Sequence, residues 1–300
     1  MRLSLIVSIF NRRDLFACGL KSWSQQTLPA SDWELILVDD MSNEDLREVY
    51  GPYIGQLNIR HVRMDHTKHR IFHEINPGWT DGQAENWYHT PALSINLGLR
   101  LARGENIGIV QPEVVAHREA FRLGVEQAEQ RQSFVFGKMI LSSPNFRENY
   151  VLSGDPNFES HWNICQQDPG AIRFEDHELY WYLAFLRRDA AFAVGGVDEE
   201  YLRGVYAEDD DFKHRLRLAG WPPHLEREIR GFHLDHSHEN SRRGLQQTNP
   251  RLWDRISIIN RERYARWGHG RDHEYPLVAN QGYDWGSMDC LAGIEDFATT

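Results

Sequence analysis

Two apolar runs decide the fold: Leu3-Ser-Leu-Ile-Val-Ser-Ile-Phe10 and Trp33-Glu-Leu-Ile-Leu-Val38. Each is short and nearly continuous, which is typical of a strand buried on both faces of a sheet. Between them, residues 14–25 place Leu15, Leu20 and Trp23 on one side of a predicted helix. A strand, a helix and a second strand in this order favour a right-handed βαβ unit and a parallel sheet.

The same alternation continues along the chain. Further strands are predicted at 57–62, 106–110, 134–141, 180–186 and 229–234. Further helices are predicted at 91–102, 117–130, 188–194, 209–219 and 250–267. The segments 63–89 and 142–175 and the last thirty residues show no clear period and are predicted to be loops. We therefore expect a single α/β domain with a mostly parallel central sheet, flanked by helices and followed by a C-terminal helical extension.

Composition narrows the classes of function. Hydrophobic residues make up 41% of the 300 positions, enough for a sizeable core. The 33 basic and 44 acidic residues give a net charge of −11. This argues against a nucleic-acid partner, because proteins that bind the phosphate backbone of nucleic acids need a basic face. Three cysteines without metal-ligand spacing indicate neither a disulfide framework nor a cysteine metal site.

No apolar stretch reaches the roughly 18 to 20 residues of a membrane span. The first apolar run ends at Asn11-Arg12-Arg13-Asp14, and no small-residue cleavage site follows it. We therefore expect no transmembrane segment and a cytoplasmic protein.

Four polar clusters are candidates for chemistry. Asp39-Asp40 and Gln111-Pro112-Glu113 follow predicted strands, where ligands of open α/β sheets bind. Taken alone, Asp39-Asp40 is explained equally well as a helix cap, and Gln111-Pro112-Glu113 is explained better as a turn. Glu208-Asp209-Asp210-Asp211 begins a predicted helix, so it either neutralises the helix N-terminus or supplies a general base. Three histidines, His233, His236 and His238, lie within six positions and favour a metal-ligand role over an incidental one.

In their order along the chain, these clusters resemble the GT-A fold glycosyltransferases, especially the broad family 2. The resemblance rests on the segments 8–12, 39–42, 96–98 with 102–105, 111–113, 195–198 and 208–209. The later half is similar to the animal β1,4-galactosyltransferases through Glu208–Asp211, His236-Ser237 and Asn249-Pro250-Arg251. Together the resemblance covers about residues 3–260. It implies a GT-A catalytic domain at 1–240, with nucleotide-binding and acceptor-binding halves at about 1–115 and 116–240, on which residues 241–300 pack.

The resemblance also implies a role for each matching residue. The nucleotide-sugar donor, commonly a UDP-sugar, is expected to contact Ser8, Phe10, Asn11, Arg12, Asp39, Asp40, Asn96 and Gln111. Glu113, His233 and His236 are expected to hold a divalent metal, Mn²⁺ or alternatively Mg²⁺. Asp209 is the expected general base, and Glu208 is expected to bond the acceptor. Further acceptor contacts are expected from Trp79, Trp87, Tyr206 and Asp210.

The implied function is metal-dependent transfer of a hexosyl-type sugar to a carbohydrate or other hydroxyl acceptor, with inversion at the anomeric carbon. Gln111 stands where the family usually has an Asp, which favours the alternative of a non-catalytic nucleotide-sugar-binding module. Galactose specificity does not carry over, because the aromatic residue that precedes the Glu-Asp-Asp of galactosyltransferases is out of register here. A sugar nucleotidyltransferase or hydrolase is a further alternative, although residues 11–13 lack the Gly-rich or Lys-bearing phosphate loop usual there.

Overall fold

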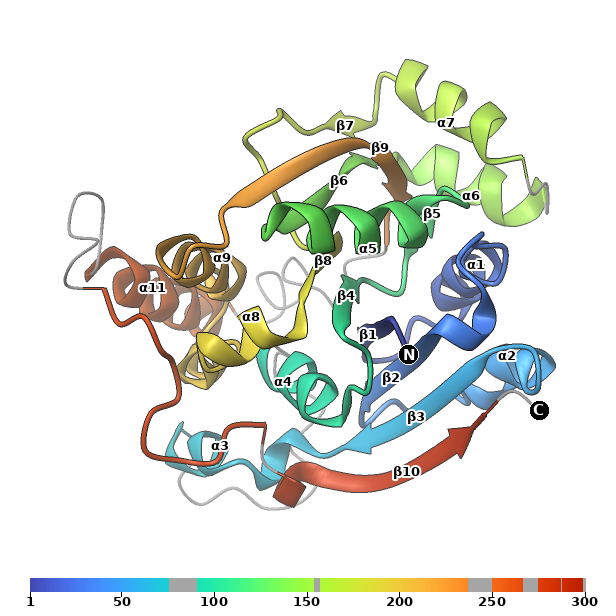
Figure 1. Ribbon diagram of the computed structural model, residues 1–300. Helices are drawn as coiled ribbons and strands as arrows, with labels where there is room; N and C mark the ends of the chain where they lie inside the picture. The colour runs from blue at the N-terminus through green and yellow to red at the C-terminus, as the bar shows by residue number, and fades with distance from the viewer. Residues whose placement is uncertain (76–90, 154–156, 237–249, 267–274, 287, 299–300) are drawn as a thin grey trace.

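The computed structural model describes residues 1–75, 91–153, 157–236, 250–266, 275–286 and 288–298. Ten strands of this described chain form one sheet, in the order β10-β3-β2-β1-β4-β8-β6-β9-β5, with β7 paired to β6 (Figure 1). The strands are β1 (Leu3–Ile9), β2 (Trp33–Asp40), β3 (Asn58–Met64), β4 (Asn106–Val110), β5 (Val114–Ala116), β6 (Phe134–Leu141), β7 (Ile172–Arg173), β8 (Leu183–Arg187), β9 (Pro223–His233) and β10 (Leu291–Phe297).

The parallel part of the sheet is its N-terminal half. Strands β3, β2, β1 and β4 are parallel neighbours, and β9 is parallel to β6. Strand β8 lies antiparallel between β4 and β6, while β5 and β10 are antiparallel to β9 and β3. The predicted α/β architecture with a mostly parallel central sheet is therefore confirmed.

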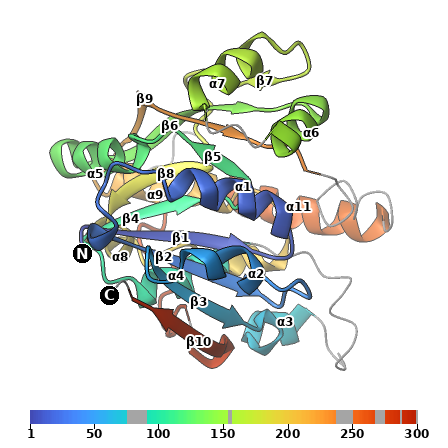
Figure 2. The ribbon, with the colours of Figure 1, turned by 90° about the vertical axis from the view of Figure 1, so that its right-hand side faces the viewer.

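Helices cover both faces of this sheet (Figure 2). Leu5 of β1 packs in one core with α1 (Arg13–Trp23), α2 (Arg47–Tyr50) and α5 (Ala120–Arg131). Its neighbour Ile6 faces the opposite core, formed with α4 (Pro91–Leu101), α8 (Arg188–Ala193) and α9 (Glu208–Leu218). Adjacent strand residues point to opposite faces, so a continuous apolar run is what a strand between two helical layers requires.

Two helices occupy the segment that was predicted to be a loop between 142 and 175. They are α6 (Pro144–Ser153) and α7 (Phe158–Gln167), so that prediction was wrong. The Asn157 side chain accepts a hydrogen bond from the Ser160 amide at 3.2 Å and caps α7. Trp162 and Cys165, three positions apart on α7, pack in a third core beside β9. Asn157, one of the polar residues that suggested a loop, thus belongs to a helix end, where such residues are favoured.

The end of the chain was also predicted to be a loop, and this was wrong as well. Residues 291–297 form β10, whose Ile294 pairs with Val62 of β3. Apolar alternation is weak in β10 because it is an edge strand, in which only Leu291, Gly293 and Phe297 are half-buried and the other residues are exposed. Within 63–89, a short helix α3 (Arg70–Ile75) replaces part of the expected loop; residues 76–90 lie outside the described part.

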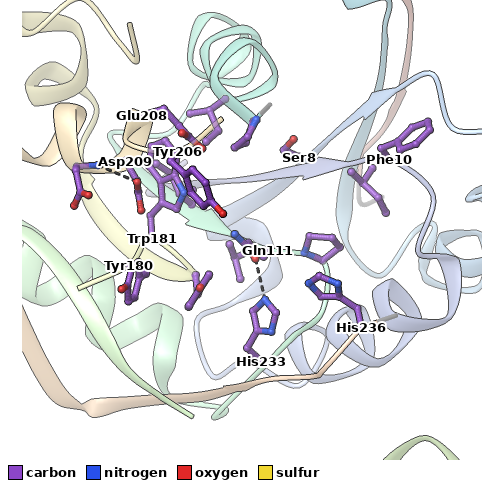
Figure 3. A pocket seen from close by; sticks show the side chains of 18 of the residues that line it. Ser8, Phe10, Gln111, Tyr180, Trp181, Tyr206, Glu208, Asp209, His233 and His236 are labelled. Atoms are coloured by element: carbon purple, nitrogen blue, oxygen red, sulfur yellow. Dashed lines mark hydrogen bonds between the residues drawn. The ribbon is translucent and has the colours of Figure 1, made fainter. Parts of the chain in front are cut away.

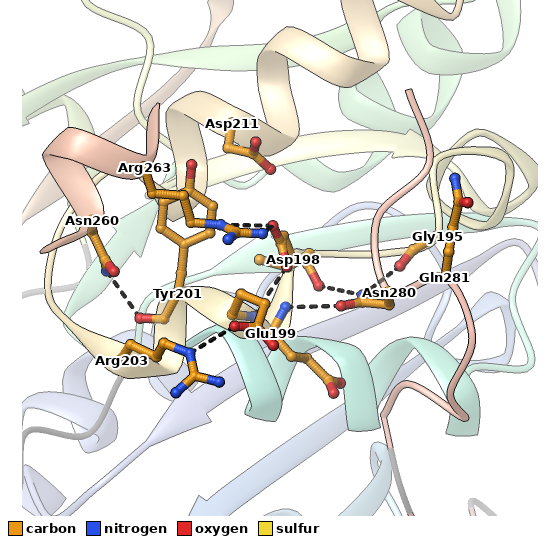
Figure 4. A network of polar contacts seen from close by, with 12 residues as sticks. Gly195, Asp198, Glu199, Tyr201, Arg203, Asp211, Asn260, Arg263, Asn280 and Gln281 are labelled. Carbon is orange, nitrogen blue, oxygen red and sulfur yellow. Dashed lines mark hydrogen bonds and ion pairs between the residues drawn. The ribbon is translucent and has the colours of Figure 1, made fainter. Parts of the chain in front are cut away.

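The C-terminal segments are bonded to the residues that precede α9 (Figure 4). The helix α11 (Pro250–Arg266), close to its predicted bounds, contributes Arg263, which bonds Asp198 at 2.6 Å. The Asn280 amide donates to the carbonyls of Gly195 and Val197 at 2.7 and 2.8 Å. These contacts hold residues 195–198, at the start of the segment that leads to the acidic cluster 208–211.

None of the helices that the structure describes is both long and apolar enough to cross a lipid bilayer.

Candidate functional site

A cleft of about 770 Å³ opens at the carboxyl ends of the parallel strands. Ser8 and Phe10 reach it from the end of β1, Asp40 from the end of β2, and Gln111 from the residues after β4. Strand ends meet here because β1 lies between β2 and β4 in parallel register. This edge is where open α/β sheets bind their ligands.

Strand pairing places Glu113 beside His233. Val114, the first residue of β5, pairs with His233, the last residue of β9, and the Leu234 amide donates to the Glu113 carbonyl at 3.0 Å. As a result, Nε2 of His233 lies 3.0 Å from Oε1 of Glu113. His236, three residues further on, places its Nε2 3.4 Å from the same oxygen.

Arg12 is the third group at this carboxylate. Its Nη1 donates to Oε1 of Glu113 at 2.7 Å, although residues 12 and 113 come from different elements. Arg12 lies just before α1 with φ of 66°, and this left-handed turn follows another at Asn11. Full burial by itself would raise the pKa of the Glu113 carboxyl, but the charges of Arg12, His233 and His236 outweigh it and hold that pKa well below its usual range.

The donor set fits a divalent metal ion. The ligand atoms of Glu113, His233 and His236 all lie within 4.8 Å of one another. Oε2 of Glu113 and Nδ1 of His233 are buried and make no hydrogen bond to any residue in the described ranges. One carboxylate oxygen with two imidazoles suits a borderline ion such as Mn²⁺ or Zn²⁺.

Gln111 takes part in the cluster as a hydrogen-bond acceptor. Its Oε1 lies 2.9 Å from Nε2 of His233, which also faces Oε1 of Glu113. Two acceptors at one ring nitrogen place a proton there, which that nitrogen would have to lose before it could bind a metal ion. Gln111 therefore orients His233 in this arrangement without adding negative charge.

The acidic cluster lies across the cleft from the histidines. Figure 3 shows Tyr206, Glu208 and Asp209 on one side of Gln111 and the two histidines on the other. Tyr206 and Ala207 have φ of 74° and 70°, and this double left-handed turn brings α9 into the cleft by its first residues. Glu208, Asp209 and Asp210 all line the cleft, while Asp211 turns inward to a buried ion pair with Arg215.

The other predicted donor residues have different surroundings. Asp40 lines the cleft and bonds Nδ1 of His66 at 2.8 Å. Asp39 is buried outside the cleft lining, accepting from the Ser42 amide at 2.8 Å and facing His61 at 3.2 Å. Asn11, likewise outside that lining, accepts from the Asn43 amide at 3.1 Å.

Asn96 lies below the cleft, in the core beside the segment 195–199. Its side chain bonds both backbone groups of Val197, each at 2.8 Å, and donates to Glu199 at 2.9 Å. These bonds give it a supporting position under the loop that leads to α9. Trp79, Trp87 and His238, predicted as acceptor or metal residues, lie outside the described ranges.

Sequence reasoning missed several residues that line the cleft. Tyr180 and Tyr182, in the run predicted as the start of a strand, precede β8 and stack at 5.4 Å between ring centroids. Tyr182 also lies 4.8 Å from the His233 ring. Arg261 and Tyr264 enter from α11. An aromatic run before a strand was a usable signal for the first pair, whereas nothing local marked the α11 residues.

The sheet, its helical layers and the strand-end cleft together define the class: this chain has a fold of the GT-A type found in glycosyltransferases. No family model matches the sequence. Among curated proteins, the chain is 26% identical over 213 residues to the uncharacterized glycosyltransferase EpsJ of Bacillus subtilis (strain 168), covering 70% of this chain. The chain matches 54% of that relative's length.

Solved structures share the fold at low identity. The mannosyltransferase PcManGT from Pyrobaculum calidifontis, in complex with GDP-Man and Mn²⁺, gives a TM-score of 0.51 at 16% identity, over 77% of this chain and 56% of that one. S. aureus TarS 1–349 in complex with UDP gives 0.52 at 15%, over 94% and 76%. Its complex with UDP-GlcNAc gives 0.54 at 14%, over 89% and 74%.

Proposed function

We propose that this protein is a metal-dependent, inverting glycosyltransferase that moves a sugar from a nucleotide-sugar donor, in the first instance a UDP-sugar, to an acceptor hydroxyl. The observation that carries the proposal is one cleft lined by Asp209 on one side and by His233 and His236 on the other, with the carboxylate of Glu113 buried directly behind the two histidines. Support also comes from the glycosyltransferase relative and from fold neighbours solved with UDP, UDP-GlcNAc and GDP-Man.

The proposed reaction needs positive charge on one side of the cleft and a proton acceptor on the other. The leaving nucleoside diphosphate develops negative charge, which a divalent cation held by Glu113, His233 and His236 would stabilise when bound. The end of β1 and Asp40 are proposed to contact the nucleotide. Residues at the opposite wall, Tyr206 and Asp210, are proposed to contact the acceptor.

Asp209 is proposed to take the proton of the attacking hydroxyl. A hydroxyl is a poor nucleophile near neutral pH, and a carboxylate within hydrogen-bond reach accepts its proton as the new bond forms. Asp209 is half-buried on the cleft wall, and one of its oxygens accepts from the Asp210 amide at 3.0 Å. Glu208, deeply buried beside it, is proposed to bond the acceptor. Direct attack with a single base inverts the anomeric centre.

Binding and turnover test the proposal separately. UDP is expected to raise the melting temperature of the wild type with Mn²⁺ and much less with EDTA, because a ligand of the folded state stabilises it by mass action. His236→Ala is expected to lose most of the Mn²⁺-dependent shift. A panel of UDP-sugars with hydroxyl acceptors, read out as UDP release, is expected to show turnover that Asp209→Asn lowers by about 10²- to 10⁴-fold.

The same variants separate catalysis from mere binding. Asp209→Asn should keep the UDP shift of the wild type, since its carboxylate is placed on the acceptor side. Gln111 is the observation that favours a binding module, because it replaces a charged metal ligand by a neutral amide. UDP binding with no turnover on any donor, in wild type and Asp209→Asn alike, would select that second function.

A further inference from the structure

The Arg12–Glu113 ion pair lies at the centre of the proposed metal site. The Glu113 side chain is fully buried, whereas the Arg12 side chain lines the cleft and is 29% solvent-exposed. Arg12 reaches Oε1 at 2.7 Å, nearer than either His233 at 3.0 Å or His236 at 3.4 Å. The guanidinium is therefore the nearest cationic group to Glu113 in this arrangement.

The charge at this site is low for a metal centre. Glu113 is the one carboxylate in the cluster that the described residues form, and the neighbouring Gln111 is neutral. A single negative charge cannot fully neutralise both a guanidinium and a divalent cation. A cation that binds Glu113 must therefore compete with Arg12, or share the carboxylate with it at an electrostatic cost.

Arg12 also has a second possible partner. It lines the same cleft as Ser8 and Phe10, which are proposed to contact the nucleotide. A guanidinium matches phosphate as well as carboxylate, with paired N–H donors for either group. A diphosphate in the cleft would thus offer Arg12 a new anion at the moment when a cation occupies Glu113.

We infer that Arg12 is an exchangeable counter-ion that couples donor binding to metal binding. Without ligands, Arg12 pairs with Glu113 and keeps the affinity of the site for a free cation low. When a nucleoside diphosphate is bound, Arg12 pairs with its phosphates and leaves Glu113 to the cation, so each ligand strengthens the other. This inference rests on the proposed function, because it assumes a diphosphate donor in this cleft.

Direct Mn²⁺ binding tests it, by titration calorimetry and by the paramagnetic signal of free Mn²⁺, with and without UDP. The variants are Arg12→Gln, which removes the charge, and Arg12→Lys, which keeps the charge on a shorter side chain. Arg13→Gln is the matched control: its neighbouring guanidinium bonds Glu48 at 2.7 Å and is absent from the described cleft lining.

For the wild type and Arg13→Gln, UDP is expected to tighten Mn²⁺ binding by about tenfold or more, a coupling within the usual range. Arg12→Gln is expected to bind Mn²⁺ alone about tenfold tighter than the wild type, since a hydrogen-bonded charge no longer competes. It should bind UDP more weakly, and the mutual strengthening should shrink to within about threefold. Arg12→Lys should bind Mn²⁺ alone more tightly than the wild type and retain part of the coupling.

Two different results would overturn the inference. In the first, Arg12→Gln binds Mn²⁺ alone no tighter than Arg13→Gln while still binding UDP with Mn²⁺, and the ion pair is then static. That result would leave the proposed function standing. If Arg12→Gln does not fold, Arg12→Lys takes its place in this comparison. If the folded wild type binds neither Mn²⁺ nor UDP, the proposed function fails, and the inference fails with it.

Discussion

The buried ion pair between Asp211 and Arg215 makes a strong prediction about stability. Arg215 is 1% exposed and lies on the inner side of α9, the helix that carries Glu208 and Asp209. Its Nε and Nη2 donate to one oxygen of Asp211 at 2.8 and 2.6 Å. Its Nη1 donates to the carbonyls of Val194 and Gly196 at 2.6 and 2.8 Å, so four hydrogen bonds depend on this side chain.

Arg215→Met keeps the apolar stem and removes all four hydrogen bonds. Asp211, 3% exposed, would then be a buried carboxylate whose one remaining described hydrogen-bond donor is the Tyr275 hydroxyl, at 2.5 Å. Breaking a buried pair from one side costs about 3–5 kcal/mol, so the free energy of unfolding should fall by that amount. Replacing both partners in Asp211→Leu/Arg215→Met should recover at least about 2 kcal/mol, because no unpaired charge is left buried.

Urea unfolding followed by tryptophan fluorescence measures these differences. Arg217→Met is the matched control, since Arg217 is exposed on the same helix; its unfolding free energy should change by less than about 0.5 kcal/mol. A loss below about 1 kcal/mol in Arg215→Met would refute the reasoning, because it would mean that Asp211 is solvated or neutral. A double variant less stable than Arg215→Met would show that the pair is held for its shape rather than its charge.

Two further predictions concern backbone strain and pH. Gly196→Ala should destabilise the fold by more than Gly282→Ala in thermal unfolding. Both glycines have positive φ, 70° and 89°, and a side chain in this conformation costs about 1–2 kcal/mol. Only at Gly196 would the new Cβ also meet Asn96, at 2.5 Å. Burial by itself would raise the pKa of Asp39, but hydrogen bonds, that of His61 foremost, lower this pKa below its ordinary value of 3.8. The ionised Asp39 therefore contributes fully to the stability of the fold above pH 3.8, and this contribution is lost as the pH falls through the lower pKa of the folded state. Asp39→Asn should therefore be less stable than the wild type in urea unfolding near neutral pH, with a gap that narrows below about pH 4; a constant gap would contradict this.

The parallel half of the fold was predictable because its signal is local. Runs such as Leu3–Phe10 and 106–110 are apolar on both faces, and that pattern needs only the identities of neighbouring residues. Helices α6 and α7 and strand β10 were missed because partners far along the chain stabilise them. Phe158, for example, stacks on Phe232 at 5.5 Å, a contact that no local period reveals.

The candidate site was predictable in its residues and not in their arrangement. Spacing marked His233 and His236, and position after a strand marked Glu113, but their meeting depends on the register of β5 against β9. The pairing of Arg12 with Glu113 depends on a left-handed turn at a non-glycine residue, which sequence patterns do not indicate. Asn96 shows the converse: a polar residue in a family motif bonds a loop from within the core.

Strand β10 has a consequence for how the chain is made. It is the neighbour of β3 at one end of the sheet, although β3 is synthesised early and β10 near the end of the described chain. During synthesis the backbone of β3 is an open edge, able to pair with another nascent copy. Once in place, β10 covers this edge of β3 and presents the charged side chains of Glu295 and Asp296, and charged side chains on an edge strand discourage edge-to-edge pairing. Strand β10 thus protects this edge of the sheet against aggregation, and a chaperone would matter most in the interval between the synthesis of β3 and that of β10.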